Sequence, residues 1–335
     1  MANSSARDAT VGVDIGGTKV LAVLLGAGDD VLAEAEVPTP RTGEEMLDAV
    51  AAVVTRLSGG DRGTAVGVGA PGLVDRDGVL RFAPNLPGIV GLAVRDGLAA
   101  RIAGPRLLVG NDASCAGWAE WVLGAAQGAG TAVMVTLGTG IGGGIVTNGA
   151  VFEGEHGFAG EIGHMVVEPN GPRCPCGKKG CWERFASGSG LGRLAREAAE
   201  AGHARRVVEL AGGDPDAVRG EHVTRAAAEG DAEAREVMAS FAWWLALGLA
   251  NLANILDPDC FVLGGGLIRA GTVLIEPTRA AFAELVEAVE HRPHIPIRPA
   301  RLGERAGAIG AGLLARRVPP AEGSPNPTGA VRPLH

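Results

Sequence analysis

One pattern occurs twice in this chain of 335 residues: an apolar strand, a turn of glycine and threonine, and a second apolar strand. The first copy, VDIGGT at 13–18, lies 122 positions before the second copy, VTLGTG at 135–140. A repeat of that length is too long for a solenoid unit. It predicts two related lobes that each direct a glycine turn toward a shared cleft. Because strands alternate with helical segments elsewhere, the sequence indicates an α/β protein.

The length suits two domains, or two lobes of one enzyme. Strands are expected at 11–13, 20–25, 31–37, 65–69, 107–109, 131–137, 141–147, 260–263 and 295–297. Helices are expected at 91–102, 113–123, 191–210, 223–256, 277–289 and 307–314. Thr42 and Glu45 form a capping box, which predicts a further helix over the apolar residues from Met46 to Leu57.

The net charge and the absence of targeting signals limit the kinds of partner and the location that we expect. The net charge is −8 and no basic block is present, so we expect no nucleic-acid partner. Residues 1–10 lack an apolar core, so we expect no signal peptide and a cytoplasmic protein. The uncharged stretch 237–256 is long enough to span a bilayer. It contains Asn251 and Asn254 and lacks basic flanks, which favours a fully buried helix and no membrane partner.

A metal site is indicated between residues 155 and 183. His164, Cys174, Cys176 and Cys181 suit a tetrahedral Cys₃His zinc site. Such a zinc ion would be structural, because four protein ligands leave no open position. A disulfide between Cys174 and Cys181 is the alternative, but a cytosolic chain keeps its thiols reduced. Glu161 and Glu183 flank the zinc loop, and we expect the folded loop to point both carboxylates and the imidazole into a polar pocket.

Glycine turns suggest a nucleotide site. Turns at 16–18, 138–140 and 264–266 each follow an apolar strand, and glycines let backbone N–H groups approach phosphate oxygens. Asp14 is suited to hold Mg²⁺ through water, and Lys19 to neutralise phosphate charge. The segment 138–143 matches G-x-G-x-x-G, but the residues after it read as a strand and hairpin. We therefore expect no Rossmann site, because that motif should open a helix.

Asp112 is the best candidate for a catalytic base. It follows a strand and begins a helix, where active-site groups of α/β folds often lie. The alternative is that Asn111 or Asp112 merely caps the helix. Sequence position leaves both interpretations open.

Together these residues resemble the ROK family of sugar kinases and repressors, in an order that runs from residue 11 to about 316. The matching motifs are DIGGTK at 14–19, GAPG at 69–72, PNLPG at 84–88, ND at 111–112, GTGIGGG at 138–144, GEIGH at 160–164, CPCGKKGCWE at 174–183 and LGGG at 263–266. Trp182 stands where leucine is common in the family, so the packing beside Glu183 is expected to differ.

The resemblance implies an actin-like (ribonuclease H-like), two-lobed sugar kinase fold with a zinc-binding loop. The small lobe would span 10–112 and be completed by a helix at 305–317. The large lobe would span 113–304 and carry the zinc loop at 164–181. The tail 318–335 has five prolines and is expected to be disordered.

The resemblance also implies an activity and a site. The activity is transfer of the γ-phosphoryl group of ATP, bound with Mg²⁺, to the 6-hydroxyl of glucose, with Asp112 as general base. His164 would serve both zinc and sugar, one ring nitrogen for each. The implied hexose contacts are Gly72, Asn85, Asn111, Asp112, Glu161, His164 and Glu183. The implied contacts of ATP and its Mg²⁺ are Asp14, Gly16, Gly17, Thr18, Lys19, Thr139, Gly140, Gly264, Gly265 and Gly266.

Other members of such a family leave alternatives open. Mannose, fructose and N-acetylmannosamine are the alternative sugars, and polyphosphate is the alternative or additional phosphoryl donor. A sugar-responsive repressor is disfavoured, because only about ten residues precede the first glycine motif. The family resemblance suggests a homodimer or homotetramer.

Overall fold

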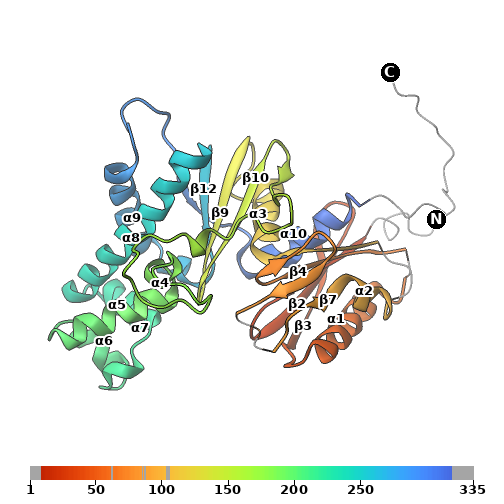
Figure 1. Ribbon diagram of the computed structural model, residues 1–335, viewed down its shortest axis with the longest axis horizontal. Coiled ribbons are helices and arrows are strands. Elements are labelled where there is room, and N and C mark those ends of the chain that lie inside the picture. The colour runs from red at the N-terminus through yellow and green to blue at the C-terminus, as the bar shows by residue number, and fades with distance from the viewer. Residues whose placement is uncertain (1–8, 62, 85, 87, 103–105, 319–335) are drawn as a thin grey trace.

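Two five-stranded sheets with the same strand order form the framework of the computed structural model, which describes residues 9–61, 63–84, 86, 88–102 and 106–318 (Figure 1). The first sheet has the order β3-β2-β1-β4-β8, with bounds β1 Thr10–Ile15, β2 Lys19–Leu25, β3 Val31–Pro38, β4 Ala65–Ala70 and β8 Leu107–Asn111. The second has the order β11-β10-β9-β12-β13, with bounds β9 Thr131–Leu137, β10 Ile141–Thr147, β11 Ala150–Val151, β12 Cys260–Gly264 and β13 Ile297–Pro299.

The two sheets also match in strand direction. β1 pairs antiparallel with β2 and parallel with β4, and β9 likewise pairs antiparallel with β10 and parallel with β12. The two copies of the strand–turn–strand pattern therefore occupy equivalent places in the two sheets. This confirms the prediction of two related lobes.

Helices α3 (Asp112–Leu123) and α10 (Ala306–Ala315) lie between the two sheets (Figure 1). A side chain at Gly12 of β1 would lie 1.8 Å from the Ala308 carbonyl oxygen, and one at Gly310 would lie 1.7 Å from that of Cys115. Glycine at these positions lets α10 lie directly on β1 and on α3. Residues of both sheets and both helices share one apolar cluster, which joins the lobes through packed side chains.

The small-lobe helices are α1 (Gly43–Ser58) and α2 (Val94–Ala99). The Thr42 hydroxyl accepts a hydrogen bond from the Glu45 N–H at 3.4 Å, and α1 buries the predicted apolar face, so that prediction is confirmed. The helix expected at 91–102 is much shorter, because Leu92–Ala93 forms β7 of a small three-stranded sheet with β5 (Leu73–Val74) and β6 (Val79–Phe82). Two-residue strands are too short to show a period in the sequence.

The remaining helices cover the second sheet and form a bundle beside it (Figure 1). They are α4 (Glu183–Ala186), α5 (Gly188–Glu200), α6 (Arg205–Leu210), α7 (Gly220–Glu229), α8 (Ala232–Leu256) and α9 (Thr272–Leu285), with 3₁₀ turns η2 (Ile162–His164), η3 (Pro215–Ala217), η4 (Gly266–Ala270) and η5 (Gly303–Arg305). The expected start of α9 at Pro277 was wrong by five residues. Pro277 lies inside the helix, where its ring nitrogen has no hydrogen to donate.

In the part of the chain that the structure describes, α8 is the one helix long and apolar enough to cross a membrane. Half of its most apolar window is buried. One face packs in the large apolar cluster, while Trp243 and Ile255 are 40% and 71% exposed. Within this single chain only one face of the helix meets the core, so the expectation of a helix fully buried in its own chain was wrong.

Candidate functional site

Parallel pairing of β1, β4 and β8 brings Asp14 and Asp112 together at the carboxyl ends of these strands. Asp14 pairs with Gly69 of β4, and Gly69 pairs with Gly110 of β8, two positions before Asp112. A side chain at Gly69 would lie 3.2 Å from the Asp112 Cα atom, so glycine allows the start of α3 to approach. At the opposite side, a side chain at Gly307 of α10 would lie 2.5 Å from Asp14 Oδ2. Two carboxyl groups are thus held near each other where both linking helices begin.

The surroundings of these two acids favour their protonated forms. Burial raises the pKa of Asp14 from 3.8 to about 7, repulsion from Asp112 adds to the rise, and the charge of Lys19 opposes it. Burial also raises the pKa of Asp112 to about 6. The hydrogen bond that its Oδ1 accepts from the Ala113 N–H at 2.7 Å acts in the opposite direction and lowers this pKa. The charge of Glu161 contributes to the same rise. A carboxylate with a pKa near neutrality is suited to accept a proton from a reacting hydroxyl.

Asn111 is the N-cap of α3. Its Oδ1 accepts from the Ser114 N–H at 2.9 Å, and its Nδ2 donates to the Gly72 carbonyl at 3.2 Å. Asn111 is therefore the cap and Asp112 is the first helical residue, while the role of Asp112 as a base stays a prediction. Gly72 has a φ of 84°, and a side chain there would lie 2.2 Å from the Phe82 carbonyl oxygen, so only glycine fits. Asn85 lies outside the described residues.

His164 lies between the metal ligands and Glu161. Its Nδ1 is 3.7 Å from Cys174 Sγ, and its Nε2 is 3.7 Å from Glu161 Oε2. One ring nitrogen therefore faces the thiols and the other faces the carboxylate, as the predicted dual role requires. Burial raises the pKa of Glu161, with His164 opposing and Glu183 adding to the rise. The sharing of the imidazole between zinc and sugar stays a prediction.

Glu183 connects the cysteine loop to the second glycine turn. Its Oε1 accepts from Cys174 Sγ at 2.9 Å, and its Oε2 is 3.4 Å from the Ile141 nitrogen. A side chain at Gly140 would lie 2.5 Å from the same Oε2 atom. The sequence predicted a carboxylate beside this loop, and the structure adds that the glycine turn lies against it.

The four predicted metal ligands converge. The ligand atoms of His164, Cys174, Cys176 and Cys181 all lie within 4.8 Å of one another. The Cys176 and Cys181 sulfurs are 3.6 Å apart, close to the spacing of about 3.8 Å for two thiolates bound tetrahedrally to zinc at 2.3 Å. The alternative disulfide between Cys174 and Cys181 is not formed, because all five cysteines are free. The donor set and its spacing therefore fit structural zinc.

The first two predicted glycine turns present exposed backbone. Gly17, Thr18, Gly138 and Thr139 are all exposed. The Gly16 N–H donates to the Lys19 carbonyl at 2.9 Å, and the Gly138 N–H donates to the Gly140 carbonyl at 3.1 Å. The turn at 138–140 connects β9 to β10, so the G-x-G-x-x-G match opens a strand, as predicted.

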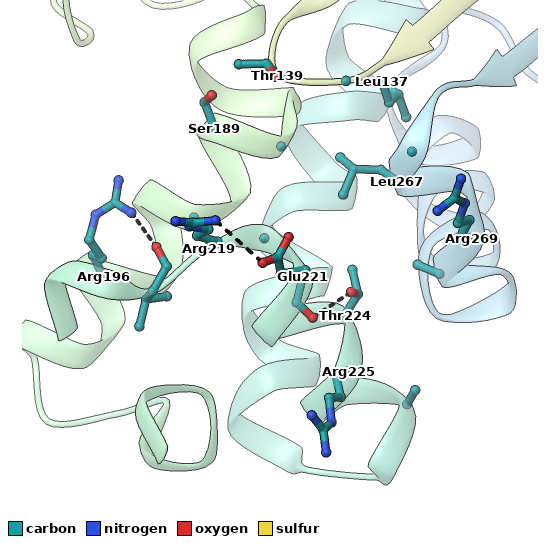
Figure 2. Close-up of a pocket in the computed structure, with 18 of the residues that line it drawn as sticks. Leu137, Thr139, Ser189, Arg196, Arg219, Glu221, Thr224, Arg225, Leu267 and Arg269 are labelled. Atoms are coloured by element: carbon teal, nitrogen blue, oxygen red, sulfur yellow. Dashed lines mark hydrogen bonds and ion pairs between the residues drawn. The ribbon is translucent and has the colours of Figure 1, made fainter. Parts of the chain in front are cut away.

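A pocket of about 950 Å³ extends from the turn at Gly138 and Thr139 (Figure 2). Its walls are residues 188–196 of α5 and residues 220–228 of α7 on one side and η4 on the other. The lining residues that carry charge are Arg184, Arg196, Arg219, Glu221, Arg225 and Arg269. Leu137, Val218 and Leu267 supply apolar surface. The pocket thus combines apolar walls, two helix N-termini and cationic side chains, which suits a phosphorylated ligand with an apolar part.

Sequence reasoning missed most of this pocket. Of the third glycine run, Gly266 lines it, whereas Gly265 passes the backbone of Leu137 so closely that a side chain would lie 2.5 Å from its carbonyl oxygen. Gly264 is buried as the last residue of β12. Arg184 lines the pocket, and its buried Nε has no hydrogen-bond partner among the described residues.

The fold and site define a two-lobed phosphotransferase, in which a carboxylate lies between a zinc-ordered loop and glycine turns. A family model described as "ROK family" matches residues 10–318. The chain belongs to the ROK family.

Three similar proteins give the comparison more detail. The chain is 39% identical over 314 residues to glucokinase from Streptomyces coelicolor, covering 93% of this chain and 98% of that protein. It is also similar to a solved ROK family glucokinase from Streptomyces griseus in complex with glucose and AMPPNP, with 40% identity and a TM-score of 0.81. That match covers 92% of this chain and 99% of the other. An N-acetylmannosamine kinase from Escherichia coli is 34% identical over 313 residues, 92% of this chain and 98% of that protein.

Proposed function

We propose that this protein is a glucokinase, which transfers the γ-phosphoryl group of ATP to the 6-hydroxyl of glucose. The observation that carries the proposal is Asp112, a carboxylate with a raised pKa at the strand edge between the zinc-ordered loop and the glycine turns. The relatives named glucokinase, and the related structure that holds glucose and AMPPNP, support the choice of substrates.

In this proposal Asp112 accepts the proton of the 6-hydroxyl as that oxygen attacks the γ-phosphorus. Asn111, Gly72, Glu161, His164 and Glu183 orient the hexose around it, and Asn85 is proposed as a further contact. The Nδ1 side of His164 faces Cys174 and would hold zinc, and the Nε2 side would then meet a sugar hydroxyl together with Glu161.

ATP is proposed to lie across both glycine turns. Its phosphates meet the turn at Gly16, Gly17 and Thr18, where Gly17 and Thr18 are exposed, with Lys19 beside it, and the turn at Thr139 and Gly140, where Thr139 is exposed. Its adenosine enters the pocket near Gly264, Gly265 and Gly266. Asp14 would hold Mg²⁺ through water in this proposal, and the ion would neutralise charge on the phosphates. Fixed N–H donors and cations that face the transferred group are the main source of catalysis in phosphoryl transfer.

The lobe boundaries are part of the proposal. The small lobe comprises 10–112 with α10, and the large lobe comprises 113–304 with the zinc loop. The helix predicted at 305–317 corresponds to α10, and residues 319–335 of the predicted tail lie outside the described residues. A cytoplasmic location and a homodimer or homotetramer stay predictions.

A coupled assay of the purified protein with Mg²⁺ tests the function. Glucose, mannose, fructose and N-acetylmannosamine are each offered with ATP and with polyphosphate. Selective turnover of glucose with ATP is the expected result. Faster turnover of another hexose, or of polyphosphate, would reassign the substrate within the family. No turnover from zinc-loaded protein would contradict the kinase proposal.

A further inference from the structure

Glu304 joins a cation from each lobe. It lies in η5, on the segment that runs from β13 of the second sheet to α10. Its Oε2 accepts a hydrogen bond from Lys19 Nζ at 3.1 Å, and its Oε1 accepts one from the Arg269 guanidinium. Lys19 follows the first glycine turn, and Arg269 lines the pocket beside the second (Figure 2). The Glu304 carboxylate therefore forms ion pairs with two cations that face the proposed donor site.

We infer that Glu304 is a counter-ion that the phosphates of the donor displace, so that it sets donor affinity. This inference depends on the proposed function. Carboxylate and phosphate oxygens accept hydrogen bonds from the same N–H donors. The planar guanidinium group of arginine binds phosphate at least as well as it binds carboxylate. Phosphate oxygens that approached Lys19 and Arg269 with Glu304 still in place would meet a like charge. The carboxylate therefore turns away as the donor binds.

The local structure makes this exchange inexpensive. The side chains of Glu304 and Arg269 are 58% and 74% exposed, and exposed ion pairs of this kind are individually weak. The segment itself is anchored, because the buried carboxylate of Glu120 accepts from the N–H groups of Arg301 and Leu302 at 2.9 and 2.8 Å. Only the Glu304 side chain needs to move, while the backbone two residues before it stays fixed to α3.

Glu36 provides a matched control. Its Oε2 also accepts from Lys19 Nζ, at 2.9 Å, and its side chain is similarly exposed, at 53%. Glu36 lies in β3 of the same sheet as Lys19, and it has no ion pair with Arg269 among the described residues. Removing the charge of Glu36 takes away one of the two carboxylate partners of Lys19. It leaves the link between Lys19, Glu304 and Arg269 intact.

The experiment measures binding of Mg²⁺-AMPPNP by calorimetry, and kcat and KM for ATP and for glucose, in four proteins. Glu304→Gln should lower the Kd for the nucleotide and the KM for ATP by about three- to tenfold, with the KM for glucose changed less than twofold. Arg269→Gln should raise both nucleotide constants, because a phosphate ligand is lost. Glu36→Gln should change them less than Glu304→Gln does. The advantage of Glu304→Gln should shrink as ionic strength rises.

The opposite signs separate this role from a structural one. A structural role of the ion pairs would make Glu304→Gln and Arg269→Gln weaken nucleotide binding together, which would overturn the inference. Unchanged nucleotide constants in Glu304→Gln would also overturn it while leaving the proposed function intact. A parent protein that neither binds the nucleotide nor turns over would overturn both.

Discussion

Asp14 should destabilise the folded protein at neutral pH. A carboxyl with a pKa of about 7, against an ordinary value of 3.8, binds its proton more tightly in the folded chain than in the unfolded chain. The folded state is therefore favoured at acid pH, and the advantage is lost as pH rises from about 4 through about 7. At 1.36 kcal/mol for each tenfold change in proton affinity, the loss approaches about 4 kcal/mol.

Asp14→Asn removes the charge but keeps the shape. Without Mg²⁺ or nucleotide, the free energy of unfolding of this variant at pH 8 should exceed that of the parent by a few kcal/mol, up to about 4. At pH 5 the difference should be much smaller, since the parent carboxyl is then protonated. Activity should fall in the same variant, because the proposed magnesium contact is lost. Stability gained at the expense of function is typical of strained active sites.

Urea unfolding from pH 5 to pH 8, followed by circular dichroism, measures this difference. Asp75→Asn is the control of opposite sign. Burial acts to raise the pKa of Asp75, but hydrogen bonds from the Val79 N–H and Arg81 hold it below its usual value. That variant should lose stability at neutral pH. An Asp14→Asn protein no more stable than the parent at pH 8, or equally stabilised at both pH values, would refute the reasoning.

Three further predictions concern the base, the zinc loop and the core. Asp112→Asn should lower kcat by about 10²- to 10⁴-fold with little change in glucose affinity. The kcat of the parent protein should fall tenfold per pH unit below about pH 6. An active Asp112→Asn variant would contradict the assignment of Asp112 as the base. Cys176→Ser should release zinc, measured by atomic absorption, and weaken glucose binding at least tenfold; retained zinc and affinity would contradict the organising role of the loop. Gly248→Ala should destabilise the fold by about 1–3 kcal/mol, because the added carbon would lie 2.0 Å from the Trp182 ring. Adding Trp182→Leu to the same chain should recover part of that loss in a thermal melt. No recovery would exclude the clash as the cause.

Features that depend on short spacing could be predicted from the sequence. The zinc ligands lie within eighteen positions, Thr42 and Glu45 at the start of α1 lie within four, and each glycine turn directly follows its own strand. Local chain geometry then fixes which side chains meet, because few residues separate them. The repeat at 13–18 and 135–140 extended this to the whole fold, since it places equivalent hairpins in two sheets.

The large pocket could not be predicted in the same way. Its walls come from α5, α7 and η4, and the charges on these elements read as ordinary exposed faces in the sequence. No local spacing relates Arg184 to Glu221 or to Arg269. The same reason hides Glu304, which meets Lys19 across 285 positions of chain. Interactions of this kind follow from how the lobes pack, and a single sequence carries no direct record of that packing.

Trp182 lies between these two cases. Its neighbours Cys181 and Glu183 identified the segment, and its departure from the leucine common in the family predicted a change in packing. The structure supplies the compensation: the buried ring lies against Gly248 of α8, and its Nε1 donates to the Trp244 carbonyl at 2.7 Å. A larger side chain next to a metal ligand therefore requires a missing side chain on a helix 66 positions later. The position of Glu183 beside the site thus depends on α8 as well as on zinc.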